Sequence, residues 1–411
     1  ENNISDIKVF EKTDFEKLEI MDVGTNNISD ISALKNANFK KLKHLNLECN
    51  KISDINVLDK VNFKELKKLY LYQNNISDIK ILEKVNFEKL EVLSLFENKI
   101  SDIKILEKVN FKELKELQIY KNTPIDIRVL EKVKFEKLVL LGLNNNNLTD
   151  INILEKVNFR ELKKIYLECN NISDISVLEK VKFEKLENLC LHTNKLTDIS
   201  VLRKVNFKEL KVIALGQNNL TDEDIKIFKK VNFPKLEELY LNNNKISDID
   251  VLENFDFKEL KYLLLYNNDI SIINIPEKIK FEKLEIFGLS KNKLSAINIS
   301  VDINFRNLEK LFLEHNLLSD IKFFEKMKFE NLHVLSLHHN MISDIKIFEK
   351  LNLKELKALY LEANNIQDIS VLEKIKFEKL NKLWIFDNEI DLNNSILIIS
   401  YLDYYINDFK Y

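Results

Sequence analysis

Leu66 to Ile79 reads L-K-K-L-Y-L-Y-Q-N-N-I-S-D-I, and this stretch recurs with small changes from one end of the 411-residue chain to the other. Its marker is Asn74, which returns every 24 residues apart from one 26-residue step between Asn218 and Asn244. A fixed period of this length indicates a stack of structural repeats and lies outside the periods of helical repeats and propeller blades. The markers are Asn2, Asn26, Asn50, Asn74, Asn98, Asn122, Asn146, Asn170, Asn194, Asn218, Asn244, Asn268, Asn292, Asn316, Asn340, Asn364 and Asn388.

Each repeat has three parts with different physical roles. Leu66, Leu69 and Leu71 belong to a segment in which the last two leucines alternate with exposed positions, so stacked repeats are expected to form a parallel sheet. The marker asparagine can satisfy backbone groups that a tight turn leaves unpaired. After the turn, the apolar spacing predicts a short helix or 3₁₀ turn, with Ser77 or Asp78 as its N-cap.

A phenylalanine ends nearly every repeat, and we expect it to fill the last core position. Leu353 stands at this place in one repeat. Most of the 26 phenylalanines are therefore predicted to be structural. The column contains Phe15, Phe39, Phe63, Phe87, Phe111, Phe135, Phe159, Phe183, Phe207, Phe233, Phe257, Phe281, Phe305, Phe329 and Phe377.

The pattern L-x-x-L-x-L-x-x-N-x-I-S-D-I, seen from Leu42 to Ile55 and again from Leu332 to Ile345, resembles leucine-rich repeats. It is similar to the class shared by bacterial internalins and the nuclear regulator of protein phosphatase 1, although the repeats here are longer than is usual for that class. The resemblance implies an α/β solenoid with a parallel sheet on its concave face and short helices or 3₁₀ turns on its convex face. It also implies a non-catalytic module whose concave face binds another protein or a peptide.

The composition excludes several classes of partner. Lys and Arg number 63 against 66 Asp and Glu, a formal charge of -3 with mixed signs along the chain. That balance argues against a general nucleic-acid or membrane-surface binder. No apolar run has the length of about 18 residues that a membrane span needs, and no signal peptide is recognisable.

The ends of the chain depart from the repeat. The chain begins with the second half of a repeat, Glu1 to Ile7, so we expect a cap, a signal sequence or another domain to precede it. Residues 1–392 are predicted to form the solenoid, a partial first unit followed by sixteen rungs. Residues 393–411 are predicted to form a capping helix with Ser395 as its N-cap, because apolar residues recur there at helical spacing.

Three internal irregularities carry structural expectations. Pro124 replaces an isoleucine and lacks an N-H, so that turn is expected to be distorted locally. The extra Glu223-Asp224 is expected to form a small bulge on the rim. Ile272 and Ala296 replace the aspartate, and with Pro276 they predict a change in curvature.

The exposed positions beside the core leucines hold the candidate binding residues. Core columns hardly vary, whereas the position between the last two leucines takes nearly every chemistry, and eight of the 12 tyrosines fall on predicted exposed strand positions. Aromatic side chains on a rigid sheet bury much area at small entropic cost and dominate interface hot spots. The alternative is cross-strand stacking that only stabilises the sheet. The candidates are Tyr70, Tyr72, Phe96, Tyr120, Tyr166, His192, Tyr240, Tyr262, Tyr266, Phe312, His315, His338, His339, Tyr360, Trp384 and Phe386.

All six histidines are expected on strand positions, and three of them, His315, His338 and His339, lie in neighbouring repeats with Glu314 and Glu362 on either side of His338. Imidazole and carboxylate at this spacing are compatible with a metal or a response to acid. Because no ligand motif fixes the geometry, we predict no metal site and favour a polar, pH-sensitive patch within the binding surface.

The sequence predicts no enzyme and no cofactor. The four glycines are isolated, so no phosphate-binding loop exists, and no nucleophile motif is present. We predict a protein or peptide ligand, no nucleic acid, no membrane insertion and no small-molecule substrate. A self-assembling structural solenoid, or the recognition arm of a larger protein, is the alternative.

The three cysteines bear on the compartment. Cys49, Cys169 and Cys190 match neither a zinc motif nor a disulfide framework, and all are expected on exposed columns. Free thiols facing solvent favour a reducing compartment. We therefore predict a cytoplasmic location, with a secreted or cell-surface location as the alternative.

Overall fold

The computed structural model describes residues 2–122, 124–249, 258–275 and 281–390. Contacts within the chain divide it into two compact units. Unit 1 comprises Glu1–Ala214 and Val231–Phe233, and unit 2 comprises Leu215–Lys230 and Pro234–Tyr411. The predicted capping helix at 393–411 lies outside the described residues.

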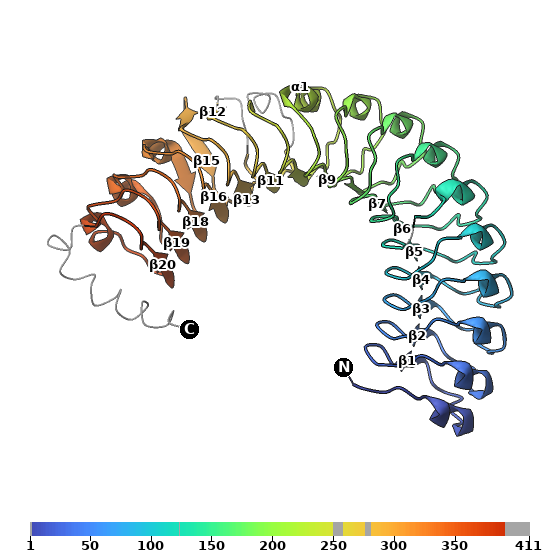
Figure 1. Ribbon diagram of the computed structural model, residues 1–411. Helices are drawn as coiled ribbons and strands as arrows, with labels where there is room; N and C mark the ends of the chain where they lie inside the picture. The colour runs from blue at the N-terminus through green and yellow to red at the C-terminus, as the bar shows by residue number, and fades with distance from the viewer. Residues whose placement is uncertain (1, 123, 250–257, 276–280, 391–411) are drawn as a thin grey trace. The chain divides into compact units, whose positions relative to one another are not determined.

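In unit 1, each rung contributes a short strand to a parallel sheet on the inner side of the bend (Figure 1). Residues 24 positions apart are partners, as in Leu69 with Leu93 and Leu93 with Leu117. The period of the sequence therefore sets the register of the sheet, and the leucines form columns on its core side. The strands are β1 (Ile20–Asp22), β2 (His44–Asn46), β3 (Lys68–Tyr70), β4 (Val92–Ser94), β5 (Glu116–Gln118), β6 (Leu140–Gly142), β7 (Lys164–Tyr166), β8 (Asn188–Cys190) and β9 (Val212–Ala214).

Unit 2 repeats this arrangement on its own inner side. Its inner strands are again parallel, and Leu263, Phe287 and Leu311 are successive partners. The inner strands described in this unit are β10 (Glu238–Tyr240), β11 (Tyr262–Leu264), β13 (Ile286–Gly288), β16 (Lys310–Phe312), β18 (Val334–Ser336), β19 (Ala358–Tyr360) and β20 (Lys382–Trp384).

The marker asparagines form a hydrogen-bonded ladder, as the sequence predicts. Asn74 Nδ2 donates to the carbonyls of Leu71 at 3.1 Å and Tyr72 at 3.2 Å in its own rung, and to that of Leu47 at 3.0 Å in the preceding rung. Asn74 Oδ1 accepts from Ile52 N at 2.9 Å. One buried side chain thus satisfies backbone groups on two rungs at a turn where Gln73 has a left-handed φ of 52°.

The turn at Pro124 lacks one of the usual donors to the marker asparagine, and the predicted distortion of the turn stays a prediction. In the preceding turn, Ile100 N donates to Asn122 Oδ1 at 3.1 Å. Pro124 holds the equivalent position one rung later and has no N-H to donate. Asn146 Oδ1 accepts from Asn122 N at 3.1 Å, a bond that Asn170 Oδ1 also accepts from Asn146 N at 3.0 Å in a turn without proline.

On the outer side, most repeats contain a 3₁₀ helix that begins just after the aspartate position of the repeat. Asp54 Oδ1 accepts from Asn56 N at 2.7 Å, and Asp78 Oδ1 accepts from Lys80 N at 2.8 Å, so the aspartate rather than the serine satisfies the first turn. No helix in the described part of the chain has the length and apolar character of a membrane span. The helices of unit 1 are η1 (Lys8–Lys12), η2 (Ser32–Asn36), η3 (Asn56–Asp59), η4 (Lys80–Glu83), η5 (Lys104–Glu107), η6 (Ile127–Glu131), η7 (Asn152–Glu155), η8 (Ser176–Glu179) and η9 (Ser200–Arg203). Those described in unit 2 are η10 (Lys226–Lys229), η12 (Lys322–Lys326), η13 (Lys346–Lys350) and η14 (Ser370–Glu373).

The substitution Asp30→Ala is expected to lower the free energy of unfolding by about 1 kcal/mol. Asp30 Oδ1 accepts from Ser32 N at 2.8 Å, and this backbone hydrogen bond lowers the pKa of the carboxyl. The contribution is therefore present above the pKa of the unfolded chain and is lost as the pH falls through the lowered pKa. Urea unfolding at neutral and acidic pH measures it. Ser29→Ala is the control, and an equal loss from it would assign the cap to the serine.

The two-residue insertion forms a one-turn α-helix, α1 (Asp222–Ile225), and the expectation of a rim bulge is wrong. Thr221 and Asp224 form a capping box, in which Thr221 N donates to Asp224 Oδ2 at 2.8 Å. Asp222 also accepts from Ser247 N at 2.7 Å on the next rung. The insertion therefore supplies its own helix start.

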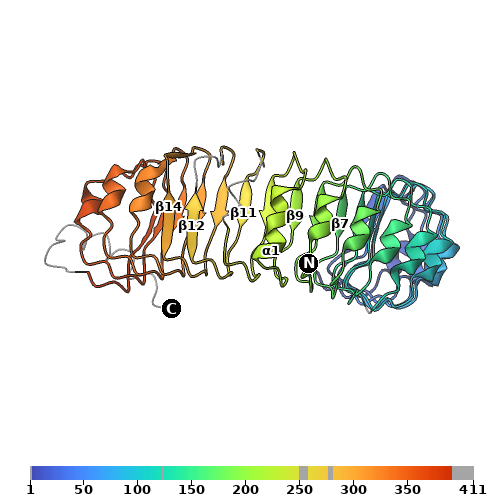
Figure 2. The same ribbon diagram turned by 90° about the horizontal axis from the view of Figure 1, so that it is seen from above.

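Part of the outer side of unit 2 consists of strands. Ile272 and Ala296 stand where other rungs have the capping aspartate, and each begins a strand that pairs with the other in parallel (Figure 2). Without the carboxylate, these β-branched segments remain extended. The predicted change in curvature stays a prediction, and Pro276 lies outside the described residues. The outer strands are β12 (Ile272–Ile275), β14 (Ala296–Ile299), β15 (Ile303–Phe305) and β17 (Met327–Phe329).

The described residues of the phenylalanine column lie in the core, with Phe15 and Phe377 as exceptions. Phe39 and Phe63 are each 1% exposed, and their rings stack with centroids 6.3 Å apart. Phe15 was expected to be buried, but it is 45% exposed because among its neighbours in the column only Phe39 stacks on it. Phe377 is half-buried, and Phe257 lies outside the described residues.

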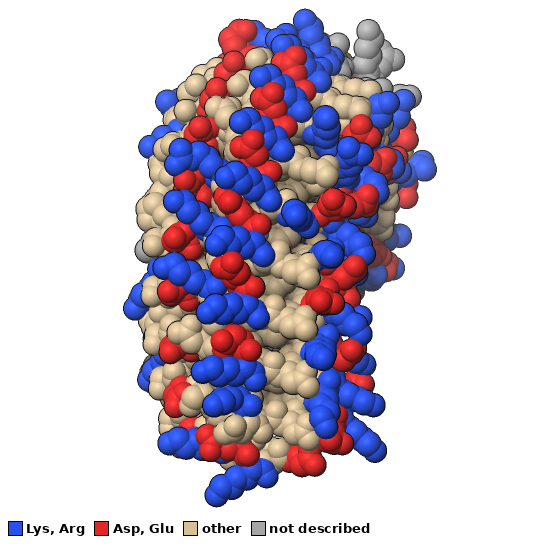
Figure 3. Space-filling view, turned by 90° about the vertical axis from the view of Figure 1, so that its right-hand side faces the viewer, with Lys and Arg blue, Asp and Glu red and all other residues tan. Residues whose placement is uncertain are grey.

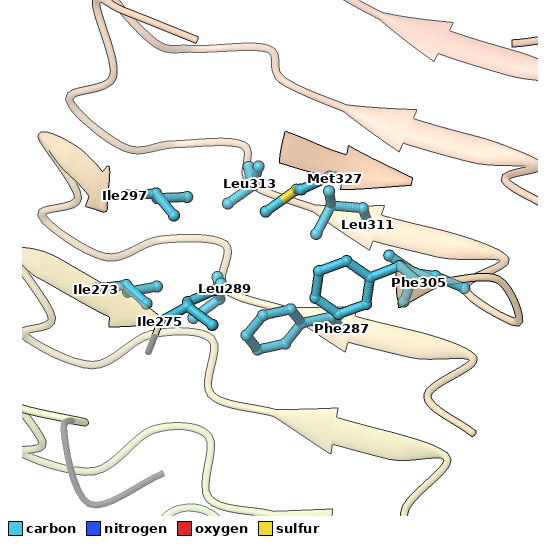
Figure 4. Close-up of a pocket in the computed structure, with 10 residues that line it drawn as sticks. Ile273, Ile275, Phe287, Leu289, Ile297, Phe305, Leu311, Leu313 and Met327 are labelled. Atoms are coloured by element: carbon cyan, nitrogen blue, oxygen red, sulfur yellow. The ribbon is translucent and has the colours of Figure 1, made fainter. Parts of the chain in front are cut away.

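Unit 2 contains a small apolar cavity between its outer strands and its inner sheet (Figure 4). Ile273 and Ile297 line it from the outer side, and Phe287 and Leu311 line it from the inner side. Its volume of about 10 Å³ is near the minimum for one water molecule, and the lining offers no polar partner. The cavity is therefore a packing gap and not a ligand site.

Ion pairs between neighbouring rungs cover the outer surface. Lys89 pairs with Glu65 at 2.6 Å, and Lys180 pairs with Glu155 at 3.1 Å. Figure 3 shows one face on which side chains of the two signs alternate. Exposed pairs of this kind each contribute little stability. Because the two signs alternate, this face carries no extended region of positive or negative potential.

Candidate functional site

The inner face of each unit presents two columns of side chains beside the core leucines. We call the position between the last two leucines of each repeat, such as Tyr70, the first inner column. The position two residues later, such as Tyr72, is the second inner column. Because side chains alternate along extended backbone, both columns point away from the core.

The structure places most of the predicted binding residues in these columns. In the first inner column are Tyr70, Tyr166, Tyr240, Phe312, Tyr360 and Trp384, which end their strands. In the second inner column are Tyr72, Phe96, Tyr120, His192, Tyr266, His338 and Phe386, which follow their strands. Tyr262 begins β11, and His315 and His339 occupy left-handed turns with φ of 54° and 52°.

Two expectations about these positions are corrected. Of the six histidines, only His44 lies within a strand, β2. Tyr72 and the rest of the second inner column also lie beyond the ends of the strands, because each inner strand is only three residues long. Small residues in the first inner column are not exposed. Ser94 is 0% and Ser336 is 3% exposed, because larger side chains around them cover these positions.

Unit 1 brings four of the aromatic candidates into one cluster. The ring of Phe96 stacks between Tyr72 and Tyr120, with centroids 4.1 Å and 4.3 Å apart. Tyr70 meets the edge of Tyr72 at 6.4 Å. Burial, followed by a hydrogen bond to the carboxylate of Glu48, raises the pKa of Tyr72. The four rings therefore form a rigid, half-buried aromatic patch.

Unit 2 brings six candidates into a continuous chain of ring contacts. His315 stacks on His339 at 4.3 Å and meets His338 at 5.3 Å, and His338 meets Tyr360 at 6.3 Å. Trp384 meets Tyr360 at 5.1 Å and Phe386 at 6.2 Å. The end of this chain is the most accessible, since Trp384 is 39% and Phe386 is 55% exposed.

His338 lies beside a buried carboxylate, as the sequence suggested. Its Nδ1 is 2.9 Å from Ser336 Oγ and 3.6 Å from Glu362 Oε1. Burial lowers the pKa of His338 and raises that of Glu362, which is 6% exposed. No three His, Cys, Asp or Glu residues in the described part of the chain are arranged to hold a metal ion. Whether the patch responds to acid stays a prediction.

A hollow beside the aromatic patch of unit 1 was not predicted. Gly142 occupies the first inner column there, and a Cβ built on it would lie 3.2 Å from Tyr120 Cδ1. The volume of the hollow is about 220 Å³. Its lining residues are Gln118, Tyr120, Leu140, Asn144, Tyr166 and Glu168. The one signal in the sequence is a glycine, Gly142, between Gln118 and Tyr166 in the first inner column.

Glu168 is the ionisable residue of this hollow with an unsatisfied atom. Its Oε2 is shielded from solvent and has no hydrogen-bond partner among the residues that the structure describes. Burial raises the pKa of its carboxyl. A buried acceptor without a donor costs free energy, so a donor supplied from outside the chain would be favourable here.

The three cysteines form no disulfide with one another, but they are not all exposed. Cys49 and Cys169 are half-buried, and Cys190 is 9% exposed, which corrects the expectation of three thiols facing solvent. Cys190 follows Tyr166 in the first inner column, and the neighbouring side chains limit its exposure. The cytoplasmic location, with a secreted or cell-surface location as the alternative, stays a prediction.

Comparison with known proteins identifies the repeat. The family model described as Leucine Rich repeats (2 copies) matches residues 64–104, 208–254, 306–350 and 330–374. No curated protein sequence matches the chain.

Several solved structures share the fold. A leucine-rich repeat protein of Leptospira interrogans is 22% identical, with a TM-score of 0.57, and the match covers 94% of this chain and 89% of that one. The functional domain of InlJ from Listeria monocytogenes is 17% identical, with a TM-score of 0.59 and coverage of 87% and 70%. The Arabidopsis receptor kinase HAESA, in complex with the peptide hormone IDA and the co-receptor SERK1, is 21% identical, with a TM-score of 0.61 and coverage of 90% and 66%. These likenesses confirm the predicted solenoid with its long parallel sheet.

Proposed function

Since the chain is a leucine-rich repeat protein, we propose that it is a non-catalytic recognition module that binds a protein or peptide through the inner columns of its sheet. The fold supplies a rigid surface of parallel strands, and proteins of this architecture use such surfaces for binding. HAESA, which shares the fold, is in complex with a peptide hormone. The absence of nucleic-acid and small-molecule ligands stays a prediction.

The observation that carries this proposal is the aromatic patch of unit 1. Phe96 stacks on Tyr72 at 4.1 Å and on Tyr120 at 4.3 Å, so these side chains lose little further freedom on binding. Large rings that are already ordered bury much area at low entropic cost. Trp384 and Phe386 offer a second, more exposed aromatic edge in unit 2.

The test is affinity capture with a variant in which Tyr72, Phe96 and Tyr120 are all replaced by alanine. Each ring in a hot spot contributes about 1–2 kcal/mol or more to binding, so capture of the partner by the wild-type chain is expected to fall by more than tenfold. The fold is retained, because the rings do not belong to the core. Quantitative mass spectrometry of the captured proteins, with circular dichroism of the bait, measures both effects.

A matched control comes from exposed apolar residues outside the inner columns. Leu317 and Met341 are each 50% exposed, and replacing both by alanine leaves the aromatic patch intact. Capture by this control is expected to equal that of the wild type. Equal capture by the triple variant would show that the stacked rings only stabilise the sheet.

A further inference from the structure

Lysine and arginine are missing from both inner columns. They make up 63 of the 411 residues, about one in seven, yet no position in either column holds one. Carboxylates are retained there: Asp22, Glu48, Glu168, Glu314 and Glu362. Glu168, Glu314 and Glu362 each keep one oxygen without a hydrogen-bond partner in the described residues. The inner columns thus combine aromatic rings with carboxylates, a pattern complementary to a basic ligand, and lysines begin several of the strands two residues earlier, at Lys68, Lys164, Lys310 and Lys382.

The hollow lined by Tyr120, Tyr166 and Glu168 joins these two chemistries at one place. Tyr120 and Tyr166 form part of its wall, and Glu168 contributes its carboxylate. Tyr120 is fixed on one side by its stack on Phe96 at 4.3 Å, and its other side faces Gly142. The Tyr120 ring therefore covers Gly142, and the hollow brings the edge of this ring together with Tyr166 and the carboxylate of Glu168.

We propose that this hollow receives an arginine side chain of the bound protein or peptide. The inference rests on the proposed function and names the chemistry of the partner. The guanidinium lies against the tyrosine rings and donates hydrogen bonds to the carboxylate of Glu168. The volume of about 220 Å³ is large enough for one long side chain.

Arginine fits this hollow better than lysine for three reasons. A guanidinium is planar and stacks on aromatic rings, whereas an ammonium is compact and strongly hydrated. It also presents several donors at once, which suits the carboxylate of Glu168 together with the side-chain amide of Asn144 at the rim. Burial disfavours the charged form of Glu168. A cation bound beside it in the hollow would favour the ionised carboxylate again.

The experiment uses small probes, so it does not depend on knowing the partner. The full chain is titrated with N-acetyl-arginine amide and followed by saturation-transfer difference NMR. Binding is expected to saturate in the millimolar range, the usual strength for so small a ligand. N-acetyl-citrulline amide, which keeps the shape without the charge, is expected to bind at least about tenfold more weakly. Equal binding of citrulline, or of N-acetyl-lysine amide, would overturn the choice of a guanidinium.

Two variants test the location of the probe. Glu168→Gln removes the charge at constant size, and Gly142→Leu displaces Tyr120 from the wall of the hollow, since a Cβ at this position would already lie 3.2 Å from Tyr120 Cδ1. Each is expected to weaken binding of the arginine probe by about tenfold or more. Glu362→Gln is the matched control, since Glu362 also has an unpaired Oε2 in the second inner column but lies in unit 2. Unchanged binding to both hollow variants overturns the proposal.

The result is separable from the test of the proposed function. If the alanine variant of the three stacked rings loses its captured partner while the arginine probe fails to bind, the recognition surface stands and the arginine site is wrong. If the probe binds and depends on Glu168 while capture is unaffected by the ring substitutions, the arginine site stands and the aromatic patch is not the contact surface.

Discussion

Replacing Asn170 with alanine is expected to lower the free energy of unfolding by about 3–5 kcal/mol. Asn170 is 8% exposed, and its Nδ2 donates to the carbonyls of Leu143 at 3.1 Å and Leu167 at 2.9 Å. Its Oδ1 accepts from Asn146 N at 3.0 Å and from Leu148 N at 2.9 Å. Alanine leaves these buried backbone groups without partners, and each such group costs about 1–3 kcal/mol. Water can reach those nearest the surface, which keeps the total below a simple sum.

Urea unfolding followed by circular dichroism measures the loss, and hydrogen exchange locates it. In a solenoid each rung contacts only its neighbours, so faster exchange is expected first at the amides of Asn146 and Leu148. Asn171→Ala is the control, because Asn171 joins the ladder only through its backbone, donating from N to Leu148 O at 2.8 Å. An equal loss of stability in the control would mean that the ladder is not held by the marker side chains.

The sequence predicts the fold well because one period controls several levels of structure. A step of 24 residues places Leu69, Leu93 and Leu117 in register, and it also places each marker asparagine beside the turn of the preceding rung. Where the 24-residue spacing or the residue type at a repeat position changes, the resulting change in local structure is only partly predictable. The lost N-H of Pro124 follows from proline chemistry, whereas the helix at Asp222–Ile225 depends on a capping box that was not recognised.

The candidate surface is predictable only as a set of positions. Alternation assigns Tyr70 and Tyr72 to the inner face, but the exposure of each position depends on the side chains one rung away. Ser94 is fully buried in the same column in which Trp384 is 39% exposed. The hollow lined by Tyr120, Tyr166 and Glu168 is likewise formed by side chains of three neighbouring repeats together. Single positions therefore do not reveal it.

The substitution Phe63→Ala is expected to destabilise the chain by about 3–5 kcal/mol, because it removes a fully buried ring and leaves a cavity between rungs. Phe63 is 1% exposed and stacks on Phe39 at 6.3 Å.

Two further substitutions show whether burial sets this cost. Phe63→Leu is expected to cost about 1 kcal/mol, since Leu353 already fills the same column at 2% exposure. Phe15→Ala is expected to cost less than Phe63→Ala by a wide margin, because Phe15 is 45% exposed and stacks on the column from one side only. Denaturant unfolding of the three variants gives the order of the losses. Similar losses at Phe15 and Phe63 would mean that the first rung is covered in solution, and the column would then owe its stability to stacking along its whole length.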